Sequence, residues 1–205
     1  LEFPWPPDWD LLLSSESPWN PGFFAYGSLP IYLLRIAAGA VALFRPEFVS
    51  PRAFYIIGRL FSALADVGSV ALIFLLGREL YDQVVGLLAA AFLGLTVLHV
   101  QLSHFYAVDT LLTFFIMLTL YLGVRTARDP TPRRSVGLGL SLGAALATKV
   151  SALPLVLPLV VAWGGGVLLQ LGASEDEADG SRVALGLSRT LQGLTLTGWL
   201  ALLSF

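Results

Sequence analysis

The chain has 205 residues, of which 56% are apolar and 13% are charged, and its formal net charge is −2. Soluble domains carry about 25% charged residues, so this composition indicates a membrane protein. The chain lacks the basic excess of a nucleic-acid-binding protein, and we expect no nucleic-acid partner. Cysteine is absent, which excludes disulfides, thiolate metal sites and a cysteine nucleophile.

The first 52 residues are predicted to form an extracytoplasmic loop. Residues 1–27 are rich in proline, tryptophan, serine and aspartate, which prevents a long helix and suits the headgroup level of a bilayer. Residues 28–44 are apolar but fall short of the roughly 20 residues that a span needs, with Arg35 in their middle. We interpret them as a membrane-parallel helix, with a short span as the alternative.

Residues 53–205 are predicted to form a transmembrane helical domain of about six spans, the last one truncated at Phe205. The tract 135–171 has about double span length and contains Lys149 and two prolines, so we expect two short helices meeting at Lys149. The fold class is therefore all-α, a polytopic transmembrane helix bundle. Its other expected spans cover residues 53–77, 84–100, 107–124 and 183–205.

The orientation follows from residues 125–134, which contain four arginines. Cytoplasmic loops are enriched in Lys and Arg, so this segment is predicted to lie inside. Counting spans from it puts the N-terminal loop, His104, Asp109 and Lys149 outside. This convergence predicts a functional site on the outer face of an integral, multi-pass protein of the cell membrane.

Two charged residues lie within the first expected span. Arg59 and Asp66 are seven positions apart, which puts them on one helix face but about 10 Å apart along the axis, too far for a direct pair. A charge in hydrocarbon costs roughly 2.5–3.5 kcal/mol on insertion scales and so usually marks a polar site. Arg59 suits a phosphate, whereas Asp66 either joins that site or is neutralised by a neighbouring helix.

Three more residues are candidates near the predicted outer turns. His104 can donate a proton or bind a metal, while His99 is interpreted as a packed core residue. Asp109 either stabilises a helix start or faces a polar cavity. Lys149 has no acidic residue near it in the sequence. It either extends toward the headgroups or supplies a counter-charge for phosphate.

Several short segments occur in a recognisable order. They are SPWNP and FAYGSLPIYL within 17–33, GRLFSALAD and LGR within 58–78, SHFYAVD at 103–109, and ATK at 147–149. This order resembles the polyprenyl-phosphate-dependent glycosyltransferases of the C superfamily, in the branch of protein O-mannosyltransferases and lipid A aminoarabinose transferases.

The resemblance implies an inverting membrane glycosyltransferase. It would move a sugar from a polyprenyl-phosphate carrier to a protein, lipid or glycan acceptor on the extracytoplasmic face, in contact with membrane lipid. A divalent metal fits this scheme, although no motif indicates one. The site residues that it implies are catalytic Asp109 and His104, with Arg59, Lys149, Asp66 and Tyr26 binding substrate.

The family's catalytic Asp-Glu pair should stand upstream of the tryptophan- and proline-rich segment. No such pair precedes Gly27, so we expect the base to be missing and residues 1–205 alone to be inactive. Two alternatives use the same buried charges differently. One is a transporter or flippase for lipid-linked sugars, and the other is a non-enzymatic membrane scaffold in which the charges join helices.

Overall fold

The computed structural model describes residues 27–44, 51–129 and 131–161. These residues form α-helices and one 3₁₀ helix, without a strand, which confirms the all-α prediction. Most of the N-terminal loop and the last expected span lie outside the described residues. The elements are α2 (Leu29–Phe44), α3 (Pro51–Leu80), α4 (Gln83–Gly94), α5 (Val97–Ser103), α6 (Val108–Arg128), α7 (Pro132–Thr148) and η2 (Val150–Leu155).

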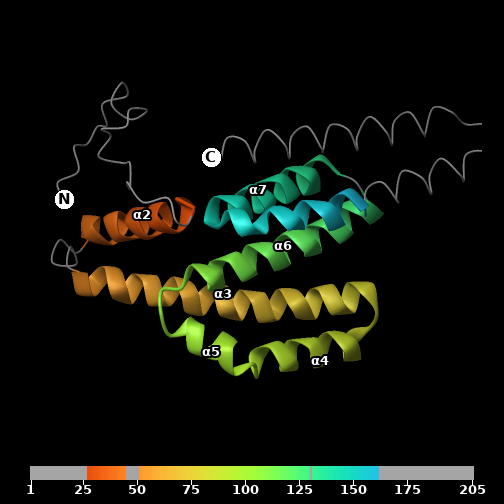
Figure 1. Cartoon of the computed structure of the whole chain (residues 1–205), viewed down its shortest axis with the longest axis horizontal. Coiled ribbons are helices and arrows are strands. Elements are labelled where there is room, and N and C mark those ends of the chain that lie inside the picture. Colours follow the sequence, from red (N-terminus) through yellow and green to blue (C-terminus); the bar gives the residue numbers. More distant parts are fainter. Residues whose placement is uncertain (1–26, 45–50, 130, 162–205) are drawn as a thin grey trace, which may run out of the picture.

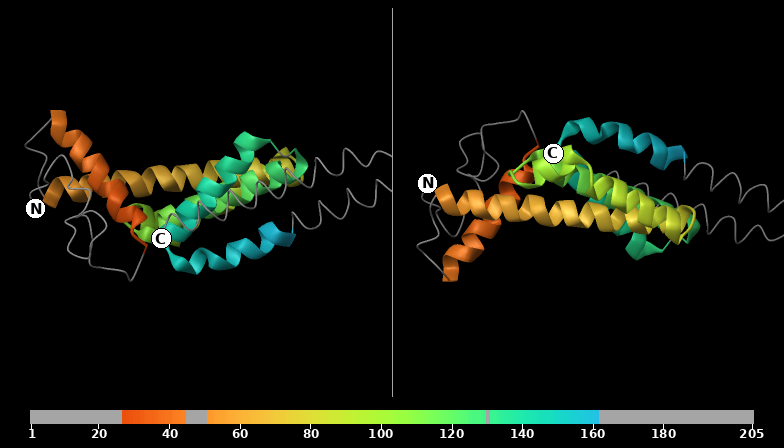
Figure 2. Two further views of the ribbon diagram at one scale, coloured as in Figure 1. Left: turned by 90° about the horizontal axis from the view of Figure 1, so that it is seen from above. Right: turned by 90° about the horizontal axis from the view of Figure 1, so that it is seen from below.

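The helices α3 and α6 pack against each other in the middle of the bundle (Figure 1). The α4–α5 pair covers the side of α3 away from α7, and α7 with η2 covers α6. The first helix, α2, contacts α3 and α7 and is inclined to α3 (Figure 2). Its predicted orientation parallel to a membrane remains a prediction.

Two helices are long and apolar enough to cross a membrane, Phe54–Leu80 and Val108–Arg128. A third span results if α4 and α5 count as one, whereas α7, with 17 residues, is shorter than a span. Large apolar side chains such as Leu64 and Val67 are exposed on the outside of α3, at 61% and 68%. These features confirm a membrane helix bundle, while the number of spans in the whole chain remains a prediction.

The expected span 84–100 is broken in the structure. The helix α4 ends at Gly94, α5 begins at Val97, and the two are bent by 63°. Glycine has a low helix propensity, and Thr96 Oγ1 donates to the carbonyl of Phe92 at 2.8 Å. Such a local side-chain bond competes with continuation of the helix, which explains why the apolar run does not stay straight.

Two expected polar turns are largely helical. The helix α3 continues to Leu80, and Asp82 then caps α4 by accepting from the Val85 N–H at 2.8 Å. The arginine-rich segment belongs mostly to the end of α6 and the start of α7. The predicted break at Lys149 is confirmed, because this residue has extended backbone (φ −162, ψ 128) between α7 and η2.

Close packing brings the helices together at two places. At the α3–α4 contact, a Cβ added to Gly86 would lie 2.6 Å from the carbonyl oxygen of Phe74, so a glycine is needed there. The main apolar core joins α6, α7 and the η2 region around Leu138 and Ala145, which are 1% and 0% exposed. This core fixes the position of α7, and therefore of Lys149, against α6.

Candidate functional site

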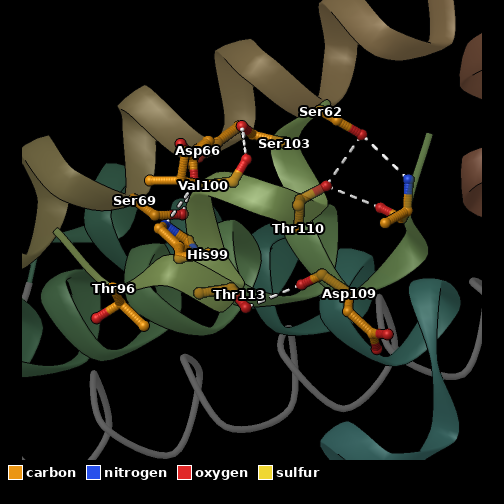
Figure 3. A network of polar contacts seen from close by, with 12 residues as sticks. Ser62, Asp66, Ser69, Thr96, His99, Val100, Ser103, Asp109, Thr110 and Thr113 are labelled. Carbon is orange, nitrogen blue, oxygen red and sulfur yellow. Dashed lines mark hydrogen bonds and ion pairs between the residues drawn. The ribbon is translucent and has the colours of Figure 1, made fainter. Parts of the chain in front are cut away.

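The start of α6 is anchored on α3 by a buried hydroxyl. Ala107 precedes α6 and has no side chain that could cap it, but its N–H donates to Ser62 Oγ at 3.2 Å. Thr110 Oγ1 lies 3.1 Å from the same oxygen and donates to the Ala107 carbonyl at 2.8 Å (Figure 3). Ser62 lies on the neighbouring helix α3 and is fully buried, and its hydroxyl satisfies the N–H of Ala107, the residue at the N-cap position of α6. The first turn of α6, which carries Asp109, is thereby held in place.

The loop between α5 and α6 also contacts the start of α2. The Tyr106 hydroxyl donates to the carbonyl of Pro30. The Tyr106 ring packs on α3 at Gly58, where an added Cβ would lie 2.7 Å from the ring carbon Cγ. Tyr106 therefore joins three elements at this end of the bundle.

The end of α7 meets the same region. The Gly27 N–H donates to the carbonyl of Thr148 at 3.0 Å, which satisfies one of the free carbonyls at the α7 C-terminus. A Cβ added to Gly27 would lie 1.8 Å from the carbonyl oxygen of Ala147, so no other residue fits this approach. The starts of α2 and α6 and the end of α7 thus come together.

The pair of Asp109 and Lys149 lies where these elements meet. Lys149 Nζ is 2.9 Å from Asp109 Oδ1, although the residues are 40 positions apart. The side chain of Lys149 is 31% exposed and that of Asp109 is 54% exposed, so a ligand can reach both. An ion pair this exposed contributes at most about 1 kcal/mol to stability. Its small contribution to stability leaves binding of a charged ligand as the role that its exposure allows.

The other predicted site residues are not joined to this pair by a described contact. Arg59 is exposed and places its guanidinium carbon 5.5 Å above the ring centre of Tyr55. His104 ends α5, and its Nδ1 donates to the carbonyl of Val100 at 2.8 Å. Tyr26 lies outside the described residues. Of the six predicted residues, the described contacts bring Asp109 and Lys149 together.

Asp66 has a different partner, which the sequence analysis did not assign. Asp66 Oδ1 and His99 Nε2 are 2.5 Å apart, with side chains 17% and 9% exposed (Figure 3). Both atoms are buried and neither makes a hydrogen bond among the described residues, so their approach is a close polar contact without the geometry of a hydrogen bond. This contact matches the alternative in which a neighbouring helix neutralises Asp66. His99 is buried, as expected. A carboxylate within a membrane span usually needs a polar partner, and this requirement is the sequence signal that could have identified the pair.

The opposite end of the bundle carries the arginine-rich segment 125–134. Arg128 pairs with Glu79 at 2.9 Å, and Arg134 pairs with Asp129 at 2.5 Å. Because α7 begins beside Arg134 and ends at Lys149, the arginine-rich segment and the Asp109–Lys149 pair lie at opposite ends of one helix. This arrangement is the one required by the predicted orientation, which itself remains a prediction.

Titration of Tyr106 should report its burial at this end of the bundle. Burial raises the pKa of Tyr106, in the loop before α6, to about 12, from about 10 in an unfolded chain. The neutral phenol is thus the form that folding favours. Its contribution to stability is complete below about pH 10 and is lost as the pH rises toward 12. The difference in tyrosinate absorbance between wild type and Tyr106→Phe should have its midpoint near pH 12, and a midpoint near 10 would contradict the described burial.

Within the described residues, no group of three or more His, Cys, Asp or Glu side chains is placed to hold a metal ion. The structure thus defines a membrane helix bundle with an accessible acid–base pair at one end. Residues 55–170, more than half of the chain, match the profile of the dolichyl-phosphate-mannose-protein mannosyltransferase family. The chain belongs to this family, whose members are membrane glycosyltransferases with polyprenyl-phosphate sugar donors. Neither the curated proteins nor the solved structures gave a match.

Proposed function

We propose that this chain is part of a multi-pass enzyme of the cell membrane that transfers a sugar, with inversion, to an acceptor on the extracytoplasmic face. The Asp109–Lys149 pair carries the proposal, because it places a cation and a carboxylate 2.9 Å apart where three helices meet. The family name makes a mannosyl donor and a protein acceptor the first substrates to test.

The proposed chemistry is a single displacement. A general base removes the proton of the acceptor hydroxyl, and the oxygen attacks the anomeric carbon. The bond between that carbon and the phosphate oxygen breaks, and the phosphate leaves with the electron pair. The base is expected among residues outside the described part of the chain.

Lys149 is proposed to stabilise the leaving phosphate. Its ammonium group has three N–H donors, so it can keep its bond to Asp109 and still donate to a phosphate oxygen. A preorganised cation near developing negative charge lowers the barrier without reorganisation during the reaction. Asp109 then acts as the residue that positions Lys149. Arg59 remains a second candidate cation, and Asp66, which contacts His99, has no role in this scheme.

The test is Asp109→Asn in the intact protein, assayed with a polyprenyl-phosphate sugar and an acceptor. We expect kcat to fall about 10²-fold, the low end of the range for removing one element of electrostatic stabilisation, while membrane insertion is retained. Asp129→Asn is the matched control, because it removes an ion pair at the other end of α7 and should leave transfer unchanged. Wild-type turnover in Asp109→Asn would remove this residue from the site.

A further inference from the structure

The break between α4 and α5 forms an open groove of ≈ 580 Å³. One end is lined by Gly94, Leu95 and Val97, and the other by Gln101 and His104. The volume falls within the range of about 300–1,000 Å³ that is typical of ligand clefts. The α4–α5 pair covers α3 on the side away from α7 (Figure 1), and Lys149, which follows α7, is not among the residues that line the groove.

One face of α5 lines the groove, and the other packs against α3. Val97, Val100, Gln101 and His104 follow a spacing of three and four residues, which puts them on one helix face, and all four line the groove. His99 points from the other face toward α3, where it contacts Asp66 at 2.5 Å. This buried contact fixes the rotation of α5 and keeps the groove-lining face turned outward.

The polarity of the groove changes along α5. Leu95 and Val97 line the end at the helix break, and the polar residues Gln101 and His104 follow about 6–10 Å further along the axis, with Phe105 beside them. Tyr106 follows at this end, and Tyr is enriched at the membrane–water interface. A bilayer lipid has the same direction of polarity, with its chain deeper than its headgroup.

The polar end also has the chemistry to bind an anionic headgroup. His104 Nδ1 donates to the Val100 carbonyl, so Nε2 is the nitrogen left for a ligand, and in the protonated ring it is a donor. The Gln101 amide provides two further N–H groups. The groove lining contains no carboxylate that would repel a phosphate.

We propose that this groove binds one bilayer phospholipid. An acyl chain lies along Leu95 and Val97, and the phosphate accepts hydrogen bonds from Gln101 and His104. The occupant is a bilayer lipid and not the sugar carrier, because the carrier phosphate is assigned to Lys149, which does not line the groove. The choice of a bilayer lipid over the carrier therefore rests on the proposed function.

The test uses the intact protein in nanodiscs that contain a phospholipid with a photoreactive group at the end of its acyl chain. Labelling of Leu95 and Val97, mapped by mass spectrometry, should exceed that of Leu64 and Val67 on α3 several-fold. All four side chains are exposed and apolar, at 79%, 78%, 61% and 68%. Equal labelling at the four positions would show unspecific contact with bulk lipid and overturn the proposal.

Variants separate the chain from the headgroup. Val97→Trp fills the groove and should reduce the labelling of Leu95 to the level of Leu64, whereas Leu98→Trp, outside the groove lining, should not. His104→Leu should reduce labelling by the phospholipid but not by a photoreactive diacylglycerol, which has no phosphate. Loss of labelling on addition of polyprenyl phosphate, but not of unlabelled phospholipid, would assign the groove to the carrier and overturn the proposal.

Discussion

Lys149→Met in the intact protein is expected to lower the kcat of sugar transfer by about 10²–10³-fold, the range for removing one electrostatic stabiliser of a transition state. Methionine is unbranched and of similar length to lysine, but it lacks the positive charge that would balance the leaving phosphate. The melting temperature should change little, because the Asp109–Lys149 pair is exposed and contributes at most about 1 kcal/mol to stability.

Steady-state kinetics with a polyprenyl-phosphate sugar measure this effect. Lys149→Arg keeps the charge and should recover part of the activity, although the planar guanidinium has a different geometry. Arg133→Met is the matched control, because Arg133 is an exposed cation at the opposite end of α7. If Lys149→Met has the same kcat as this control, the phosphate does not bind at Lys149.

Asp66→Leu is expected to have the largest effect on stability. It leaves His99 Nε2 buried without the Asp66 oxygen that lies 2.5 Å away. An unsatisfied buried polar group costs about 1–3 kcal/mol, and a buried charge that loses its partner costs roughly 3–5 kcal/mol. We therefore expect a decrease in the free energy of unfolding of at least about 1 kcal/mol.

A double-mutant cycle tests whether this loss arises from the pair itself. Replacing both Asp66 and His99 by leucine removes both polar groups, so the double variant should be more stable than the sum of the single effects predicts. Unfolding in detergent gives the four free energies. Strictly additive losses would mean that the two side chains do not stabilise each other.

The sequence alone determined the membrane class and the helical fold, because continuous apolar stretches of about 20 residues have the length of a helix that crosses a bilayer with its backbone hydrogen bonds satisfied. It also predicted the helix break at Lys149, where a charge and two prolines interrupt an apolar tract. The order of the expected spans put Asp109 and Lys149 at the same end, and the structure brings them into contact.

Only the tertiary structure decided which side chains meet. Apolar periodicity gives the end of a helix at which a residue lies, but not its lateral neighbours, which depend on packing between distant segments. The contact of Asp66 with His99 comes from the packing of α5 on α3. Lys149 likewise reaches Asp109 because the core around Leu138 holds α7 against α6. Spacing along one chain carries no information about such contacts, since they arise only when the helices are packed together.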